Sequence, residues 1–330
     1  MYINTLTFSH NIENFNNISP KGFLYFDIET TGLQKKNALV YLIGSAFYQG
    51  DNVWKVQQWF ADNPDEEQQI LEMFCQYASS FAGFCHFNGT RFDIPFLEFR
   101  CQHYGISSPF SGKSSRDLYA IYRPLKKFLA LPGMKQKDLE AFLQIARKDT
   151  LSGKDGIKLY RDMIKYRDPS YRQPLLLHNQ EDVQGLVQLE CLQAYTELLQ
   201  GNFCLISCEY HSDLLTAHLK PVLPFPQPLH FLYREWDVHA VGNEITVAIN
   251  VSDKTLRNYF ANYKDYFYLP KEDTAIHKSL GNFLDKSLKK QASKDTCYTK
   301  FYPDNDFFQS HEQVETYLRH NLPILFTFND

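Results

Sequence analysis

Two acidic residues, Asp27 and Glu29, are the first in the chain whose type and spacing suit a chemical role. They lie one residue apart in FLYFDIETTGL, an apolar and aromatic run that predicts a buried strand. Because strand side chains alternate between faces, we expect both carboxylates on one face and Ile28 in the core. Such a pair is costly to desolvate without a cation, and hard oxygen ligands suit Mg²⁺ or Mn²⁺. A solvated strand end is the alternative.

Two further acids follow in separate segments. Asp93, in HFNGTRFDIPFL, directly precedes Ile94 and Pro95, so a helix N-cap is an alternative role for it. Asp182, in LLLHNQEDVQGL, comes four residues after His178, which places an imidazole and a carboxylate on one face of a predicted helix. The alternative there is an ordinary pair on a helix surface. Each segment alone is weak evidence for a catalytic site, and only the three segments in this order indicate one.

Taken in order, DIETTGL, NGTRFDIPFL and HNQEDV resemble the three exonuclease motifs of the DEDD superfamily, which has an RNase H-like fold. The similarity is greatest to the YprB-like ribonuclease H-like branch and covers roughly residues 20–195. YLIG at Tyr41 to Gly44 and the pair Asp117 and Leu118 also match that branch. The resemblance therefore implies a nuclease fold in the first part of the chain.

The resemblance also implies a two-metal site. Two ions, Mg²⁺ or Mn²⁺, would be held by four carboxylates, with the first bridging them: Asp27, Glu29, Asp93 and Asp182. A pair of such ions activates water and stabilises the charge that develops during phosphodiester hydrolysis. His178 would then be the general base. His-based members have four residues between His and Asp, whereas three lie between them here, the spacing of tyrosine-based members; orienting the water is the alternative role for His178.

Substrate contacts are predicted close to these motifs. Thr30 and Thr31, in the turn after the acidic pair, are expected to present hydroxyl and backbone N–H groups to the terminal nucleotide. Asn88 and Phe92 are expected to line the same pocket, by hydrogen bonding and base stacking respectively. Core packing is the alternative for Phe92. For Asp117 the alternatives are support of the site and a helix N-cap.

The elements that position these residues indicate an α/β fold. Strands are predicted at 22–28, 38–48 and 53–60, as an antiparallel meander, with a short strand at 83–87. Helices are predicted at 66–81, 94–104 and 173–199 and within 116–147. We expect an RNase H-like mixed sheet with flanking helices over residues 1–200.

The second part of the chain is expected to be separate. Residues 201–228 contain a crowd of prolines and are predicted to be a linker. Residues 229–330 are expected to form a smaller α+β domain of unassigned role, opened by a hairpin of 229–236 and 244–251. Residues 254–300 carry ten basic against five acidic side chains. This stretch, which includes Phe283, could follow a nucleic-acid backbone, and a solvated helix face is the alternative.

Composition excludes several classes of protein. The 330 residues are 44% hydrophobic and 15% aromatic, which excludes disordered and fibrous chains. A net charge of −4 means that any nucleic-acid partner must be held by a local patch or by metal. The longest apolar runs, such as Ala38 to Phe47, fall short of the roughly 20 residues of a membrane span, and the first residues do not read as an export signal. We therefore expect no membrane association, a cytoplasmic location and reduced cysteines.

Together these patterns predict a two-metal-dependent nuclease. We expect a 3′-to-5′ exonuclease acting on single-stranded or frayed ends of DNA or RNA. Two alternatives stay open at this point: a catalytically silent nucleic-acid-binding module of the same fold, and an endonuclease that cuts structured RNA or RNA–DNA hybrid.

Overall fold

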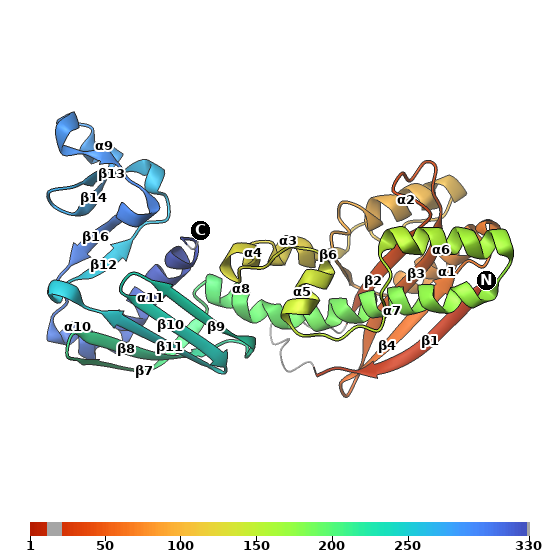
Figure 1. The fold of residues 1–330 in the computed structure, drawn as a ribbon, viewed down its shortest axis with the longest axis horizontal. Helices are drawn as coiled ribbons and strands as arrows, with labels where there is room; N and C mark the ends of the chain where they lie inside the picture. Colours follow the sequence, from red (N-terminus) through yellow and green to blue (C-terminus); the bar gives the residue numbers. More distant parts are fainter. Residues whose placement is uncertain (12–21, 329–330) are drawn as a thin grey trace. The chain divides into compact units, whose positions relative to one another are not determined.

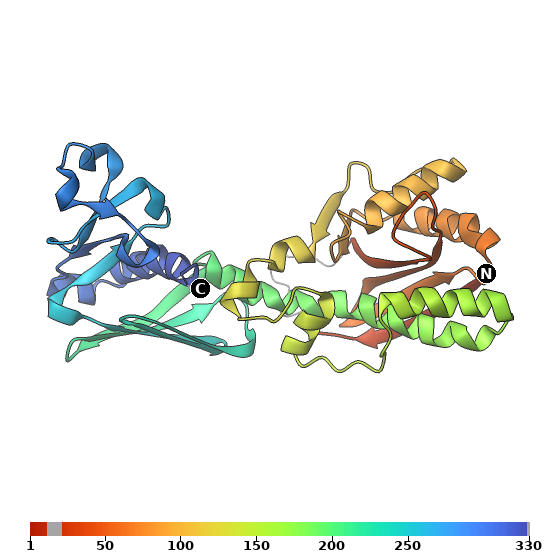
Figure 2. The same ribbon diagram turned by 45° about the horizontal axis from the view of Figure 1, so that its top comes forward.

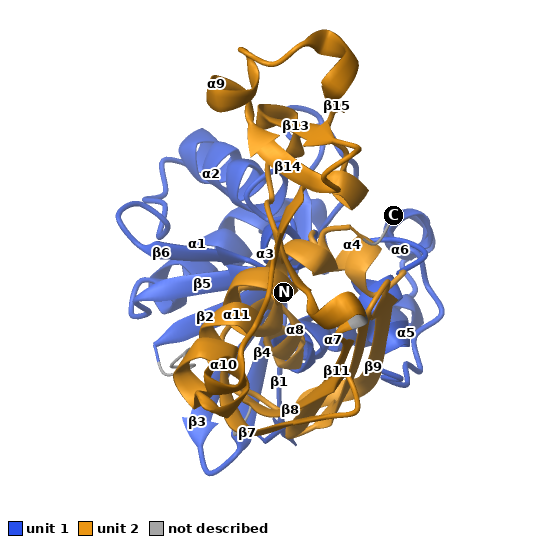
Figure 3. Ribbon diagram, turned by 90° about the vertical axis from the view of Figure 1, so that its left-hand side faces the viewer, with its two compact units in different colours: residues 1–123, 131–190 blue, residues 124–130, 191–330 orange. Residues whose placement is uncertain are grey.

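The computed structural model describes residues 1–11 and 22–328, which form two compact units (Figure 3). Unit 1 consists of residues 1–123 and 131–190, and unit 2 of residues 124–130 together with those from 191 onward. Within the described ranges, every helix is too short or too polar to cross a lipid bilayer.

Unit 1 is built on a mixed sheet with the strand order β1-β4-β3-β2-β5-β6 (Figure 1). Its strands are β1 (Tyr2–Ser9), β2 (Phe23–Thr30), β3 (Val40–Gly50), β4 (Val53–Phe60), β5 (Gly83–His86) and β6 (Ser114–Asp117). β2, β3 and β4 pair antiparallel as the predicted meander, and β5 and β6 add parallel to β2. β1, which the sequence analysis did not predict, is an edge strand with no buried side chain, so its apolar pattern is weak.

Helices cover both faces of this sheet, which gives the predicted mixed sheet with flanking helices. The helices of unit 1 are α1 (Glu67–Ala78), α2 (Asp93–Tyr104), α3 (Leu118–Tyr122), α5 (Gln136–Phe142), α6 (Gly153–Tyr166) and α7 (Arg172–Gln188). α1 and α2 pack on one face around Trp59, and α6 and α7 pack on the other around Phe60. Figure 2 shows α6 and α7 running side by side along the sheet.

Strand β2 shows the alternation that the sequence predicts. Ile28 lies in the core formed with α1 and α2. Asp27 and Glu29 are on the opposite face, where α7 packs against β2 and Asn179 reaches Asp27. The predicted geometry of the acidic pair is therefore confirmed.

The predicted helix over 173–199 is interrupted. α7 ends at Gln188, residues 189–192 form a 3₁₀ turn, and α8 (Gln193–Leu199) follows. Glu190 in this turn is fully buried and accepts two hydrogen bonds from Arg116, at 3.0 and 2.7 Å, and one from the Tyr25 hydroxyl at 3.0 Å. These hydrogen bonds fix Glu190 in the 3₁₀ turn, at a point where the spacing of apolar residues predicted a continuous α-helix.

The prediction of a linker at 201–228 is wrong, because this segment belongs to an antiparallel sheet with the order β7-β8-β11-β10-β9. Its strands are β7 (Phe203–His211), β8 (Leu214–Pro221), β9 (Phe225–Tyr233), β10 (Trp236–Gly242) and β11 (Glu244–Asn250). Pro221 ends β8, and Pro226 and Pro228 lie in β9 at the edge of the sheet. A missing N–H is tolerated at these positions, so the proline crowd does not prevent strands.

The predicted hairpin also pairs differently. β11 forms its hairpin with β10 about Asn243, whereas residues 229–233 belong to β9, which pairs with the other side of β10. The remaining elements of unit 2 are α4 (Leu125–Phe128), β12 (Leu256–Tyr259), β13 (Tyr266–Leu269), β14 (Thr274–His277), α9 (Lys278–Gly281), β15 (Lys290–Gln291), β16 (Tyr298–Phe301), α10 (Asn305–Gln309) and α11 (His311–Phe326).

Candidate active site

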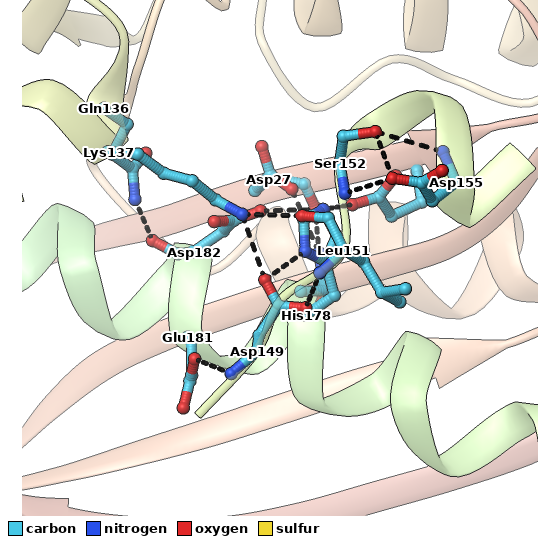
Figure 4. Close-up of polar contacts among 12 residues, drawn as sticks. Asp27, Gln136, Lys137, Asp149, Leu151, Ser152, Asp155, His178, Glu181 and Asp182 are labelled. Carbon is cyan, nitrogen blue, oxygen red and sulfur yellow. Dashed lines mark hydrogen bonds and ion pairs between the residues drawn. The ribbon is translucent and has the colours of Figure 1, made fainter. Parts of the chain in front are cut away.

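The five residues predicted to be catalytic, which come from three distant segments, lie together in unit 1. Nε2 of His178 is 3.4 Å from a Glu29 oxygen and 3.5 Å from an Asp182 oxygen. Figure 4 shows Asp27, His178 and Asp182 close together. Asp27 interacts electrostatically with Asp93, Asp182 and Glu29. The fold therefore brings the second half of β2, the first residue of α2 and the middle of α7 close together.

All of these side chains except that of Asp93 border a cavity of about 540 Å³. Asp27, Glu29, His178 and Asp182 form one wall. Ile28 and Phe87 also line the cavity. Its other wall comes from the start of α5 and from the segment that leads into α6, with Lys135, Gln136, Lys137, Thr150, Leu151, Ser152 and Gly153. The acids thus face an open space rather than packed side chains.

Burial is the main cause that raises the pKa values of three of these acids, and repulsion from neighbouring carboxylates adds to it. Burial is the main cause for Asp27, whose pKa is held well above its usual range, and the charges of Asp93, Asp182 and Glu29 add to it. Burial also raises the pKa of Glu29 to about 7, against the opposing effect of His178. The pKa of Asp93 is raised to about 7 by burial, against hydrogen bonds from its own N–H and that of Ile28.

Among the four acids, Asp182 alone is paired with an arginine in the described part of the chain. Within the described residues, no Lys or Arg forms an ion pair with Asp27, Glu29 or Asp93. Their exposed fractions are low, with Glu29 at 8% and Asp93 at 6%. Buried carboxylates that face one another around a cavity are the donor set of a hard divalent cation such as Mg²⁺ or Mn²⁺. The residues present therefore fit a divalent metal site.

His178 is held by a residue that the sequence analysis missed. Its Nδ1 lies 2.7 Å from an oxygen of Asp149, in the loop before α6. Burial alone would lower the pKa of His178, but Asp182, Glu29 and the hydrogen bond with Asp149 outweigh it, so the pKa lies above its ordinary value. Because a carboxylate only accepts hydrogen bonds, Nδ1 carries a proton and Nε2 faces the acids.

Asp149 is itself fixed by several donors. Although burial opposes it, hydrogen bonds from His178, from the N–H of Leu151 and from Lys137 lower the pKa of Asp149 to about 2. Lys137 Nζ is 3.1 Å from Asp149 and 2.6 Å from the carbonyl of Leu151. Lys137 is therefore bound to the loop that carries Asp149.

Arg147, also missed, fixes Asp182. Its guanidinium donates to Oδ1 of Asp182 at 2.7 Å and to Glu140 at 2.8 Å. It also reaches Asp149 at 3.2 Å. One oxygen of Asp182 is thus held by Arg147, while the other faces His178. No motif marks Arg147 or Asp149 in the sequence, because both lie in an irregular loop.

The matching segment YLIG supports the acidic pair. The hydroxyl of Tyr41 lies 3.5 Å from Glu29, and Nδ2 of Asn179 donates to Asp27 at 3.1 Å. A Cβ at Gly44 would lie only 1.9 Å from the side chain of Asn179, so a glycine is needed there for Asn179 to reach β2. Asn179 follows His178 directly, and its position in the HNQEDV motif was the available signal for it.

Asp93 is not the predicted N-cap alternative. α2 begins at Asp93 itself, and Phe92 occupies the cap position. The turn before it is organised by Asp117, which accepts hydrogen bonds from the N–H groups of Asn88 at 2.8 Å and Thr90 at 3.3 Å. Asp117 also caps α3 through the N–H of Tyr119, so it has both of the roles that the sequence left open.

Three of the predicted substrate contacts have partners within the protein. The hydroxyl of Thr30 donates to the carbonyl of Gly32 at 2.8 Å, and that of Thr31 accepts from the N–H of Leu39 at 2.9 Å. Asn88 uses its N–H on Asp117 and adopts a positive φ of 60°. None of these three borders the 540 Å³ cavity, so a direct nucleotide contact by any of them stays a prediction.

Phe92 is the fourth predicted substrate contact. It packs on Phe96, with ring centroids 5.5 Å apart, and borders a second hollow of about 380 Å³. The lining of that hollow includes Leu33, Lys35 and Arg91. Phe92 does not border the 540 Å³ cavity, so base stacking by Phe92 beside the acids stays a prediction.

The basic stretch of unit 2 is not the helix face considered as its alternative. Its lysines are spread over α9, β15 and short turns. Nζ of Lys289 lies 4.6 Å above the ring of Phe267, whereas Phe283 is 91% exposed. A nucleic-acid contact here stays a prediction.

Comparison with known proteins yields one family and several structures. The RNase_H superfamily profile matches residues 24–192, about half of the chain. A family B DNA polymerase from Pyrobaculum calidifontis aligns with a TM-score of 0.44 and 16% identity over 54% of this chain and 25% of the polymerase. E. coli exonuclease I in complex with a dA16 oligonucleotide aligns with a TM-score of 0.32 and 13% identity over 92% of this chain and 72% of the exonuclease. No curated protein matches the sequence.

Proposed function

This chain belongs to the RNase H superfamily, and from that premise we propose that it is a divalent-metal-dependent nuclease that hydrolyses phosphodiester bonds. The observation that carries the proposal is the meeting of Asp27, Glu29, Asp182 and His178 at one cavity, where Asp27 and Glu29 have no Lys or Arg as an ion-pair partner among the described residues. We assign it to the DEDD type, in the YprB-like branch. Its substrate would be a single-stranded or frayed 3′ end of DNA or RNA, cut in the 3′-to-5′ direction.

The acids have the metal-binding role in this proposal. Asp27, Glu29, Asp93 and Asp182 would hold Mg²⁺ or Mn²⁺, two ions to a site. Bound divalent ions lower the pKa of a coordinated water and stabilise negative charge on the phosphoryl group. Asn179 and Tyr41 keep Asp27 and Glu29 in place through the hydrogen bonds described above.

His178 supports the attack of water as a general base at Nε2. Since Asp149 holds the proton on Nδ1, the opposite nitrogen is the one free to accept a proton. This nitrogen lies within 3.5 Å of carboxylate oxygens of Glu29 and Asp182, beside the proposed metal ligands. Asp149 therefore acts as a positioning residue, as the buried carboxylate does in other His–carboxylate pairs.

Arg147 supports the site in a different way. By holding Oδ1 of Asp182, it leaves Oδ2 turned toward His178 and the cavity. It also joins Glu140 of α5 to Asp149, so the two missed residues form one connected support. We expect Arg147 to set the orientation of Asp182 rather than to touch the reacting phosphate.

End-labelled oligonucleotides test the proposal. Purified protein with Mn²⁺ should shorten a 5′-labelled single strand progressively from its 3′ end, and Asp182→Asn should abolish this. A closed circular single strand should remain intact, because an exonuclease needs an end. Cleavage of the circle would instead identify an endonuclease.

Metal binding distinguishes the proposed enzyme from the alternative, a catalytically silent nucleic-acid-binding module. Calorimetric titration of the wild type with Mn²⁺ should show binding that Asp27→Asn removes. A wild type that binds oligonucleotide but neither binds Mn²⁺ nor cleaves would contradict the proposed enzyme.

A further inference from the structure

A second group of potential metal ligands lies in unit 2, on its five-stranded sheet. His230 is on β9, and Asp237 and His239 are on β10. His230 and His239 are paired directly across the two strands. Their rings stack with centroids 4.1 Å apart and planes 12° apart. Cross-strand neighbours of this kind are the closest side chains that a sheet face can offer.

Both imidazoles converge on one carboxylate oxygen. Nε2 of His230 is 2.9 Å from Oδ1 of Asp237, and Nε2 of His239 is 3.0 Å from the same atom. One ligand atom from each residue lies within 4.8 Å of the other two. Two nitrogens and one oxygen bound tetrahedrally to zinc would be about 3.3 Å apart, from usual zinc–ligand lengths of about 2.0–2.2 Å. The two nitrogen–oxygen distances, 2.9 and 3.0 Å, are thus within a few tenths of an ångström of that spacing.

The group is accessible from solvent. The side chains of both histidines are 55% exposed and that of Asp237 is 43% exposed. Their neighbours along the strands, Phe231 and Val238, are buried and face the core, so the three ligands lie on the outer face of the sheet. An ion could bind here without any change in packing.

The chemistry of the ligands indicates the class of ion. Imidazole nitrogen suits zinc, copper, nickel and iron, whereas Mg²⁺ and Ca²⁺ prefer oxygen. We propose that His230, Asp237 and His239 form a binding site for a first-row transition-metal ion of the zinc type, with water at the remaining position. The ions expected at the acidic pocket of unit 1 differ in class, so the two sites take different metals.

The position of the site indicates what it would do. β9 is an edge strand, and Pro226 and Pro228 contribute no N–H to its pairing. The register between β9 and β10 also shifts at Ala240 to Gly242. An ion held by His230 on one strand and His239 on the other would tie this edge strand to the sheet.

The chain offers a matched control. His218 lies on the neighbouring strand β8, is exposed, and shares the sheet face with His239, because each is paired with Thr246 of β11. The Nδ1 atom of His218 is 3.5 Å from the Thr246 hydroxyl. His218 does not belong to the group formed by His230, Asp237 and His239. His218→Ala therefore removes an imidazole from the same surface without removing a proposed ligand.

Zinc titration of the full-length protein tests the inference. All variants are made in an Asp182→Asn background, since Glu29, His178 and Asp182 are a second group that zinc could bind. The background protein and His218→Ala should bind Zn²⁺ with the same affinity in excess Mg²⁺, as read by competition with a chromogenic chelator. His230→Ala and His239→Ala should each lose at least about tenfold, since even residues that only orient a ligand cost about 10- to 100-fold.

Two further measurements keep the result unambiguous. Zn²⁺ should raise the melting temperature of the background protein and of His218→Ala, but not of His239→Ala, while all have the same far-UV circular dichroism without metal. Zinc affinity that is equal in His230→Ala, His239→Ala and His218→Ala would overturn the site. In the otherwise wild-type chain, His230→Ala should retain Mn²⁺-dependent nuclease activity, so failure of the zinc site and failure of the nuclease proposal are distinguishable.

Discussion

Unit 1 contains a fully buried carboxylate, Glu67, and a half-buried one, Asp27, and their surroundings differ. Glu67 on α1 is fully buried, but it accepts hydrogen bonds from Arg100 through both oxygens, from the Tyr104 hydroxyl at 2.8 Å and from the N–H of Val40 at 2.8 Å. Asp27 on β2 is surrounded by other acids and has one hydrogen-bonding side chain, Asn179, at 3.1 Å. The charge of Glu67 is compensated by a cation and hydrogen bonds within the fold, whereas that of Asp27 is not.

This difference distinguishes a carboxylate that stabilises the fold from carboxylates that we propose to bind metal. A buried ion is costly unless a partner and hydrogen bonds compensate it. At Glu67 the protein supplies both, and the cluster joins α1 to α2. At Asp27 and Glu29 it supplies few donors, and both residues border a cavity, where the proposed function places divalent ions that would compensate their charge. Asp149 is intermediate, since its donors include the proposed base His178.

The largest expected effect follows from removing an unbalanced charge. Asp27→Asn should lower Mn²⁺-dependent cleavage by at least about 10³-fold, about 4 kcal/mol in the activation free energy, because a ligand that stabilises transition-state charge is lost. Steady-state rates on a labelled oligonucleotide measure this. Asp51→Asn, at an exposed turn, is the control and should retain the wild-type rate. Equal rates for the two variants would mean that cleavage occurs elsewhere.

Removing the partner of a balanced charge should instead affect folding. Arg100→Met leaves Glu67 buried and lacking its cation, and should lower the free energy of unfolding by about 3 kcal/mol. Urea unfolding followed by circular dichroism measures the loss. Adding Glu67→Gln should recover part of it, since no unpaired charge then remains. If Arg100→Met reduced cleavage per folded molecule as strongly as Asp27→Asn does, the distinction between the two regions would be lost.

Asp149 should show an intermediate effect on catalysis. Asp149→Asn keeps the shape but weakens the hold on the Nδ1 proton of His178, and should lower kcat about 30-fold, about 2 kcal/mol, with little change in KM. Mn²⁺ affinity, measured by calorimetry, should stay close to wild type because Asp149 is not a proposed ligand. An unchanged kcat would remove Asp149 from the mechanism, and a loss of Mn²⁺ binding would make its role structural.

The smallest expected effect is a gain in stability. In EDTA, Asp27→Asn should be about 1 kcal/mol more stable than wild type, because it relieves repulsion among Asp27, Glu29, Asp93 and Asp182. Adding Mn²⁺ should stabilise the wild type and leave the variant nearly unchanged. Thermal unfolding with and without metal measures both. A variant that is less stable than wild type in EDTA would show that Asp27 is already balanced within the fold.

Local patterns in the chain were enough to predict the shared face of the acidic pair and the meander, whereas the three motifs were recognised from their resemblance to a known family. Alternation along β2 places Asp27 and Glu29 on one face and Ile28 in the core, and this depends only on neighbouring residues. The helical spacing of His178 and Asp182 is local in the same way. Periodicity of two or of about four residues is a property of the backbone, so it can be seen without knowledge of the rest of the fold.

The supports of the site and the structure of unit 2 depend on contacts between distant segments. Asp149 meets His178 across 29 residues, and Asn179 meets Asp27 across 152, in a space that depends on Gly44. The prolines of 201–228 suggested a linker because their tolerance at a sheet edge depends on which strand lies beside them. Side-chain partners are chosen by packing in three dimensions, and one sequence carries no local pattern for a partner that is far away in the chain.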